Sequence, residues 1–179
     1  MATTSLDPQA RYNSVARMLH WLIGTIVILN IIGGLGHDAL EGILDVMPLH
    51  KAAGVTVFAL TIVRIVWRLI HPAPPLPSDM PGWERAASHA THAAFYLLLI
   101  LVPLTGWIMT SAGSRPLSWF GLFDIPKFNV TKDDAIVGLS GEGHEILALL
   151  FGALAIIHIA AALRHHFILK DNVLRRMIG

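Results

Sequence analysis

The 179-residue chain contains no cysteine, and only 14% of its residues are charged. The lack of cysteine excludes disulfides, thiolate catalysis, iron–sulfur ligation and covalent attachment of a c-type haem. Soluble domains carry about 25% charged residues, whereas this chain is 54% hydrophobic and has a mean hydropathy of +0.61. The formal net charge is only +1, so nucleic acid is not an expected partner. The composition predicts a protein embedded in membrane lipid.

Motifs of soluble enzymes are missing as well. The sequence has no phosphate-binding loop, no HExxH zinc motif and no nucleophile elbow. The glycine-rich GEGHE at 141–145 precedes an apolar run and follows no predicted strand, so it does not indicate a phosphate site. No catalytic side chain is therefore predicted.

Four apolar runs are long enough to cross a bilayer, which takes about 20 residues. They cover residues 16–35, 49–70, 89–111 and 144–167, and they form one transmembrane domain spanning residues 1–179. The connection at 71–82 is rich in proline, which ends helices. The longest connection, 112–143, holds the aromatic segment LSWFGLF, which suits the membrane interface. The fold class is predicted to be all-α, an integral membrane four-helix up-down bundle.

Lysine and arginine are distributed unequally between the two predicted ends of this bundle. One end has nine basic residues: Arg11, Arg17, Arg64, Arg68, Arg85, Arg164, Lys170, Arg175 and Arg176. The other has four, Lys51, Arg115, Lys127 and Lys132, together with eight of the twelve acids. Because cytoplasmic loops are enriched in Lys and Arg, both termini are expected in the cytoplasm. No cleavable signal peptide is expected, since the first apolar run is long enough to remain as an anchor.

Ten histidines are unusual in so apolar a chain, because ionisable groups inside spans are costly and indicate function. His144 and His158 are 14 residues apart on the fourth run. At 100° per residue they share a face to within about 40°, and they are roughly 21 Å apart along the helix. Such a pair cannot bind one metal, but it can supply one ligand to each of two sites stacked across the membrane. A histidine at a helix end can also be a plain interfacial residue.

Topology supplies a partner for each of these histidines. His20 starts the first run at the cytoplasmic side, and His50 starts the second run at the outer side. The expected pairs are therefore His20 with His158 at the inner level, and His50 with His144 at the outer level. Two imidazoles from different helices at each level are what six-coordinate haem b requires. The prediction is two haem b groups with these four histidines as iron ligands.

Small residues accompany all four histidines, one helical turn further along the same face. They are Gly24 after His20, Gly54 after His50, Ala148 after His144, and Ala162 after His158. A porphyrin plane beside a ligand needs such a gap, although small residues are also common at membrane helix contacts. His89 has Ala93 at the same spacing, so it stays open as an alternative ligand.

Two arginines are placed to bind the propionates of the inner haem. Arg64 follows His50 by 14 residues, which puts it on the same face at the inner level, and Arg17 lies one turn before His20. Arginine binds carboxylates through two parallel hydrogen bonds. The alternative for both is the ordinary excess of positive charge at the cytoplasmic side.

Several segments together resemble the bacterial cytochrome b561 family over nearly the whole chain. They are MLHW at 18–21, PLHKAAGV at 48–55, HATHAAFYLLL at 89–99, SWFGLF at 118–123, GHE at 143–145 and HIAAALRHHFILKDN at 158–172. The resemblance implies two b haems on the four histidines above and electron exchange with a quinone, with ubiquinone as the expected type. It also implies a place in the bacterial inner membrane and, in the branch of the family that looks like superoxide oxidase, a quinone pocket lined by His92 and His165. These two belong to a group of four histidines expected at the cytoplasmic end, which could instead be interfacial residues.

One branch of that family resembles superoxide oxidase, which passes electrons from superoxide to ubiquinone. The acidic outer side weighs against superoxide, because an anion is steered by positive charge, although Lys51 lies beside His50. A periplasmic redox protein is the other possible partner. The chain could also be the cytochrome b anchor subunit of a dehydrogenase or hydrogenase-type complex. A haem-free transporter, which would place acids and broken helices at mid-depth, is the least favoured reading.

Overall fold

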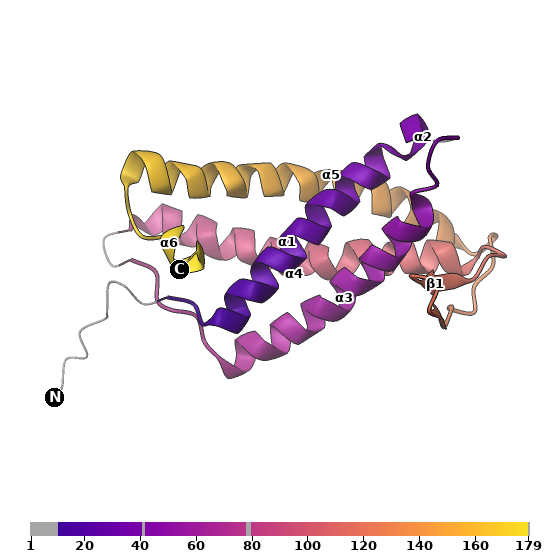
Figure 1. Cartoon of the computed structure of the whole chain (residues 1–179), viewed down its shortest axis with the longest axis horizontal. Coiled ribbons are helices and arrows are strands. Elements are labelled where there is room, and N and C mark those ends of the chain that lie inside the picture. Colours follow the sequence, from indigo (N-terminus) through magenta and orange to yellow (C-terminus); the bar gives the residue numbers. More distant parts are fainter. Residues whose placement is uncertain (1–10, 41, 78–79, 179) are drawn as a thin grey trace.

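The computed structural model describes residues 11–40, 42–77 and 80–178, and they fold mainly into four long helices (Figure 1). The long helices are α1 (Ser14–Leu35), α3 (Met47–Ile70), α4 (Gly82–Ser111) and α5 (Ala135–Arg164). The shorter elements are α2 (His37–Leu40), β1 (Leu117–Trp119), β2 (Phe123–Ile125), the π-helical turn η1 (His165–Leu169) and α6 (Arg175–Ile178). All four long helices are apolar enough to cross a membrane, as the four apolar runs predicted.

All four long helices begin before the predicted residue, and two of them begin well before it. The third begins at Gly82 instead of residue 89, and the fourth at Ala135 instead of residue 144. The added turns are more polar than the spans, and hydropathy detects only the apolar part of a helix. Glu84, in the first turn of α4, accepts a hydrogen bond from Arg164 Nη1 at 3.1 Å, so the start of α4 is joined to the end of α5.

The long helices form two layers, one of α1 with α3 and one of α4 with α5, and the layers cross at an angle (Figure 1). The helices of each layer pack against each other, and α3 also packs on α4. Seven buried apolar residues make the core between the layers: Leu19, Ile23, Val27, Val57, Leu98, Leu99 and Phe151. Large apolar side chains such as Leu29 and Ile156, 63% and 70% exposed, cover the outside. This arrangement suits a bundle whose solvent is lipid.

The connection between α4 and α5 contains a β-hairpin, which the sequence pattern did not predict. β1 and β2 pair antiparallel, with Trp119 opposite Phe123. Phe120 and Gly121 have φ of 49° and 75°, and the Leu122 N–H donates to the Trp119 carbonyl at 2.9 Å. Positive φ at both central positions defines a type I′ turn. The indole of Trp119 donates to Thr56 Oγ1 at 3.0 Å, so the hairpin is fastened to α3.

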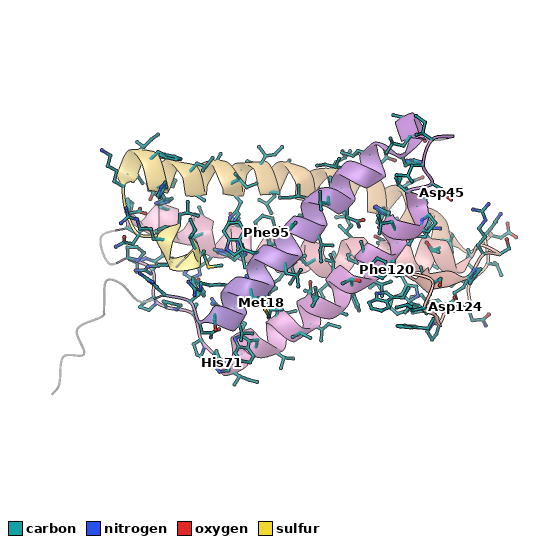
Figure 2. All side chains as sticks on the ribbon, viewed as in Figure 1. Met18, Asp45, His71, Phe95, Phe120 and Asp124 are labelled. Carbon is teal, nitrogen blue, oxygen red and sulfur yellow. The ribbon has the colours of Figure 1, made fainter. Side chains whose placement is uncertain are left out.

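The hairpin and α2 lie at one end of the bundle, the hairpin end, and α6 and the start of α1 lie at the other, the terminal end (Figure 1). Figure 2 labels Phe120 and Asp124 at the hairpin end and His71 at the terminal end. The tail after α5 folds back at the terminal end. Trp21 Nε1 donates to the Met177 carbonyl at 2.9 Å, and the buried Arg176 donates through Nη1 to the Pro75 carbonyl at 2.6 Å.

Candidate cofactor site

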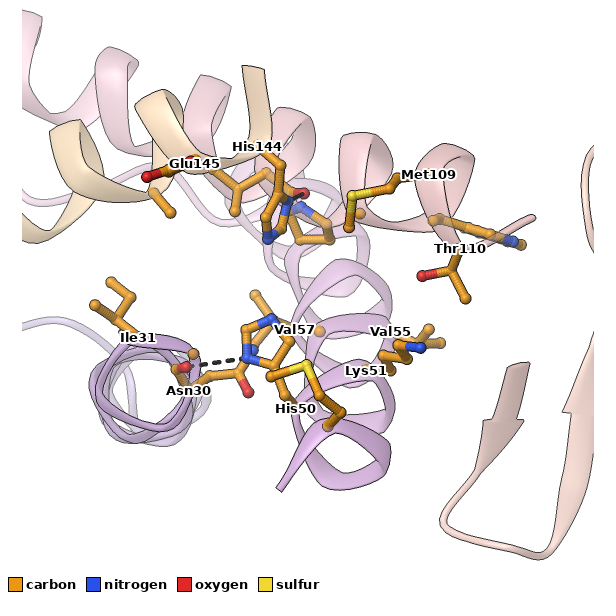
Figure 3. A pocket seen from close by; sticks show the side chains of 18 of the residues that line it. Asn30, Ile31, His50, Lys51, Val55, Val57, Met109, Thr110, His144 and Glu145 are labelled. Atoms are coloured by element: carbon orange, nitrogen blue, oxygen red, sulfur yellow. Dashed lines mark hydrogen bonds between the residues drawn. The ribbon is translucent and has the colours of Figure 1, made fainter. Parts of the chain in front are cut away.

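His50 and His144 form the hairpin-level pair, and they reach it from opposite layers. His50 is on α3 and His144 on α5, and their ring centroids are 6.1 Å apart with an interplanar angle of 80°. Figure 3 shows the two rings pointing toward each other across a cavity. The structure thus brings together the two residues that the sequence paired at the outer level.

Main-chain carbonyls orient both rings of this pair. His50 Nδ1 lies 3.1 Å from the Asn30 carbonyl, drawn as a dashed line in Figure 3, and His144 Nδ1 lies 2.9 Å from the Val102 carbonyl. A carbonyl oxygen only accepts, so each Nδ1 carries the hydrogen. The second nitrogen, Nε2, is left as a neutral lone-pair donor. Metal-binding imidazoles are commonly oriented in this way by the hydrogen bond of their other nitrogen.

Glycines let each ring approach the neighbouring helix. A Cβ added at Gly34 would lie 2.9 Å from His50 Cε1, and one added at Gly106 would lie 3.0 Å from His144 Cε1. Gly34 follows Asn30 by four residues, as Gly106 follows Val102, so each ring rests on the glycine one turn beyond the carbonyl that it contacts. Residues on α1 and α4 therefore seat the histidine rings carried by α3 and α5.

The sequence reasoning missed these two glycines because it examined only each histidine's own helix. An isolated glycine within an apolar helix, such as Gly106, was the available signal, since it often marks a close approach. The predicted Gly54 lines the cavity of the hairpin-level pair. At the predicted Gly24, an added Cβ would meet no atom within 4 Å among the described residues, so there is open space beside it.

The cavity at the hairpin level has a volume of about 560 Å³, within the ~300–1,000 Å³ range of cofactor and ligand pockets. Its walls come from both layers, with both histidines, the two seating glycines and Phe151 among the lining residues. It is mostly apolar, and Lys51, Asp38 and Glu145 bring charge to its lining. It has the size and surroundings for a flat, largely apolar cofactor between the two layers.

His20 and His158 form the terminal-level pair, with ring centroids again 6.1 Å apart and an interplanar angle of 69°. His92 on α4 lies equally close to His158, at 6.0 Å, and Phe95 lies at 5.2 Å. His92 Nδ1 donates to the Ser88 carbonyl at 2.7 Å. The structure therefore places His92 beside His158 as the alternative at this level, whereas no ring contact joins His89 to either histidine of the pair among the described residues.

The layers distinguish His20 from His92 as the partner of His158. His92 and His158 belong to α4 and α5, which pack directly on each other, so their proximity follows from that packing. His20 belongs to α1, in the opposite layer, and so faces His158 across the space between layers, as His50 faces His144. A cofactor held between the layers would use one ligand from each. The cross-layer pair is therefore the better candidate.

Arg64 lies beside the terminal-level pair, as the 14-residue spacing from His50 predicted. Its Nη2 is 3.4 Å from His20 Nδ1, and its Nε donates to the Tyr96 hydroxyl at 3.4 Å. Its Nη1 is buried and has no hydrogen-bond partner among the described residues. A buried unpaired guanidinium nitrogen is costly, and a carboxylate would satisfy it. Arg17, by contrast, forms no side-chain hydrogen bond or salt bridge within the described part of the chain, and its backbone N–H donates to the Asn13 carbonyl at 3.1 Å.

His165 does not join His92 in any ring contact or hydrogen bond within the described part of the chain. Its Nδ1 instead lies 2.5 Å from Asp171 Oδ2, in a tail segment where Lys170 has a positive φ of 52°. Its side chain is only 13% exposed. The expected grouping of His92 with His165 in one pocket therefore stays a prediction.

The 6.1 Å separation has a direct chemical meaning. A metal–imidazole bond is about 2 Å long, so two imidazoles on opposite sides of one metal ion place their ring centroids about 6 Å apart. Rotating either ring about the common axis leaves that separation unchanged. Both cross-layer pairs thus have the spacing of axial ligands to a single iron, and the hairpin-level pair has a suitable cavity between the layers.

Comparison with known proteins places this arrangement in a family. The sequence profile described as prokaryotic cytochrome b561 matches residues 11–179. The chain is 37% identical over 174 residues to "Cytochrome b561 homolog 2" of Escherichia coli K12, covering 94% of this chain and 92% of the relative. It is 29% identical over 177 residues to "Probable superoxide oxidase CybB" of Yersinia pestis, covering 94% and 96%. The chain belongs to the prokaryotic cytochrome b561 family, whose members are haem-containing electron-transfer proteins of membranes.

Proposed function

We propose that this protein carries electrons across the membrane through two haem b groups, between a redox partner at the hairpin end and a quinone at the terminal end. The observation that supports it most is the pair of cross-layer histidine couples, each at 6.1 Å. His50 with His144 and His20 with His158 are proposed as the axial ligands. The hairpin end would face the periplasm of a bacterial inner membrane, following the distribution of Lys and Arg.

The residues present fit haem b. The Nδ1 hydrogen bonds leave Nε2 of His50 and His144 available to iron, and the unpaired Nη1 of Arg64 suits a propionate at the terminal level. Gly34 and Gly106 let the His50 and His144 rings lie directly against the neighbouring helices, which sets the position of both rings. Bound haem supplies the one-electron chemistry, because its iron alternates between ferric and ferrous states. The protein's part is to hold the ligands, exclude water and supply charge.

The core residue Phe151 connects the two levels. It is buried, it lines the hairpin-level cavity, and it lies seven residues from both His144 and His158. Its ring is 5.7 Å from that of Phe95, which is 5.2 Å from His158 (Figure 2 labels Phe95). The levels are roughly 21 Å apart along α5. These two packed rings therefore lie on the apolar route between the levels.

Quinone exchange is proposed at the terminal end, with His92 and His165 as the interacting side chains. An imidazole can hydrogen-bond a quinone carbonyl and can take up or release a proton near neutral pH. Asp171, which contacts His165 Nδ1, would orient that ring and leave its Nε2 available to the quinone. Ubiquinone is the expected quinone.

The decisive experiment is a pyridine haemochrome assay on detergent-purified protein, with haem counted per chain and a reduced-minus-oxidised spectrum recorded. Two b haems per chain, followed by oxidation of the reduced protein by a soluble ubiquinone, is the expected result. One haem would overturn one of the two pairs, and no haem would overturn the proposal.

Superoxide is a second candidate for the partner at the hairpin end, favoured by the name of the Yersinia pestis relative. Lys51 lines the hairpin-level cavity, but Asp38 and Glu145 line it too. Lys127 Nζ donates to the carbonyls of Gly113 and Arg115. A superoxide pulse should reduce the haems and then the quinone if this candidate is right, and haems that stay oxidised would exclude it.

A further inference from the structure

A second cavity, of about 330 Å³, opens at the terminal end between the start of α1 and the end of α3. Three arginines line it: Arg11, Arg64 and Arg68. Its other lining residues are aromatic, apolar or uncharged polar, with His71 as the remaining titratable group besides two tyrosines, and none is a carboxylate. The proposed electron path uses only Arg64 of the three.

Among the described residues, nothing supplies a counter-charge to the positive charge in this cavity. None of the three arginines forms a salt bridge within the part of the chain that the structure describes. Arg68 instead lies over the Tyr12 ring, with Cζ 5.9 Å from the ring centroid. Bringing guanidinium groups together without an anion is unfavourable. The cavity is therefore built to be neutralised by a ligand that carries negative charge.

The walls of the cavity are fixed by contacts between the two helices. Asn13 Oδ1 accepts from Ala16 N at 2.8 Å, capping α1, and from Trp67 Nε1 at 3.0 Å. The Trp67 ring stacks on His71 with a centroid separation of 4.0 Å. The start of α1 also adds the partial positive charge of a helix N-terminus. A ligand would meet a preformed site and would lose little free energy in ordering it.

The depth of the cavity in the membrane indicates the class of ligand that it binds. It lies where two membrane-spanning helices, Ser14–Leu35 and Met47–Ile70, begin and end, which is the depth of lipid headgroups. Tyr12, Trp67 and Tyr96 line it, and Tyr and Trp are enriched at that depth. Basic pockets between membrane helices on the cytoplasmic side bind anionic lipid headgroups. We propose that Arg11 and Arg68 bind the phosphate of an anionic phospholipid, with its acyl chains along α1 and α3.

The test compares lipid binding by purified full-length variants. Short-chain phosphatidylglycerol is titrated in detergent, and bound lipid is counted by native mass spectrometry, with phosphatidylcholine and inorganic phosphate titrated in parallel. The double variant Arg11→Gln, Arg68→Gln should bind phosphatidylglycerol at least about tenfold more weakly than the unchanged chain. Arg175→Gln, which alters an exposed arginine outside the cavity, is the matched control and should bind normally. Arg68→Lys keeps the charge and should retain most of the binding.

Three results would overturn the proposal. The double variant could bind phosphatidylglycerol like the unchanged chain, or inorganic phosphate could bind as tightly as the lipid, which would indicate a free anion as the ligand. The double variant could also lose haem while its helical circular dichroism is unchanged, which would assign the arginines to a haem propionate. Haem content is measured separately in each variant, so failure of the haem proposal is distinguished from failure of this one.

Discussion

The two histidine pairs have the same ring separation, but the protein holds them in different ways. At the hairpin level, helix carbonyls of Asn30 and Val102 accept from both rings, and glycines seat them. At the terminal level, His20 faces the Arg64 guanidinium, and His158 faces other aromatic rings. Helix carbonyls are fixed by the backbone, whereas Arg64 and His92 are side chains that can change rotamer. The hairpin-level pair is therefore preorganised, and the terminal-level pair can adjust to a ligand.

The largest expected effect is the loss of the haem at one level while the haem at the other level is retained. His144→Ala should remove the hairpin-level haem and His158→Ala the terminal-level haem, each lowering the content from two haems to one per chain, because a six-coordinate b haem is held only by its axial nitrogens. His20→Ala and His50→Ala should do the same at their own levels. The haemochrome assay measures this. Two low-spin haems in any of these four variants would refute the assignment of that histidine as a ligand. His71→Ala is the control, because His71 lies outside both pairs and the variant should keep both haems.

His92→Ala tests whether the terminal-level pair lies across the layers. The variant should keep both haems but exchange electrons with quinone about tenfold more slowly, since it loses one hydrogen-bonding group. Stopped-flow oxidation by a soluble ubiquinone gives the rate. Loss of a haem in this variant, with both haems retained in His20→Ala, would move the ligand pair into the α4–α5 layer.

Gly34→Ala tests the preorganisation of the hairpin-level pair. Its methyl group would meet His50 Cε1 at 2.9 Å, so the ring must shift and break its hydrogen bond to the Asn30 carbonyl. Disturbing such a supporting contact costs about 10–100-fold in metal affinity. We expect faster haem loss to apomyoglobin from the hairpin level only. Gly33→Ala is the matched control, because a Cβ there meets nothing within 4 Å among the described residues; equal effects in the two variants would contradict the seating role.

Arg64→Gln should produce the smallest effect, and only at the terminal level. Removing a positive charge near an iron makes gain of an electron less favourable, so the midpoint potential of the terminal-level haem should fall by something on the order of tens of millivolts. The hairpin-level potential should stay unchanged. Potentiometric titration followed by absorbance resolves the two. An equal shift at both levels would show that Arg64 acts through the whole bundle rather than beside His20.

The sequence was sufficient for the four spans and for the two histidine pairs, because both follow from apolar runs and from 3.6-residue periodicity. It did not predict that α4 begins at Gly82 and α5 at Ala135, because hydropathy does not detect the more polar helical turns that precede an apolar run. The hairpin depends on Phe120 adopting a positive φ, which is uncommon for a bulky residue. The glycine seats and the closeness of His92 to His158 arise between helices, so the pattern of the helix that carries the histidine does not reveal them.

The apolar core around Phe151 has a bioenergetic consequence under the proposed function. Phe151, Leu98 and Leu99 belong to one buried apolar cluster, and an apolar interior disfavours ions, so an electron passing between the levels would move without a compensating charge. The levels are about 21 Å apart in a hydrocarbon layer of about 30 Å, roughly two-thirds of its thickness. Each electron would then do about 1.5 kcal/mol of electrical work for every ~100 mV of membrane potential. The protein would therefore be a voltage-sensitive conductor, faster in one direction as the membrane becomes energised.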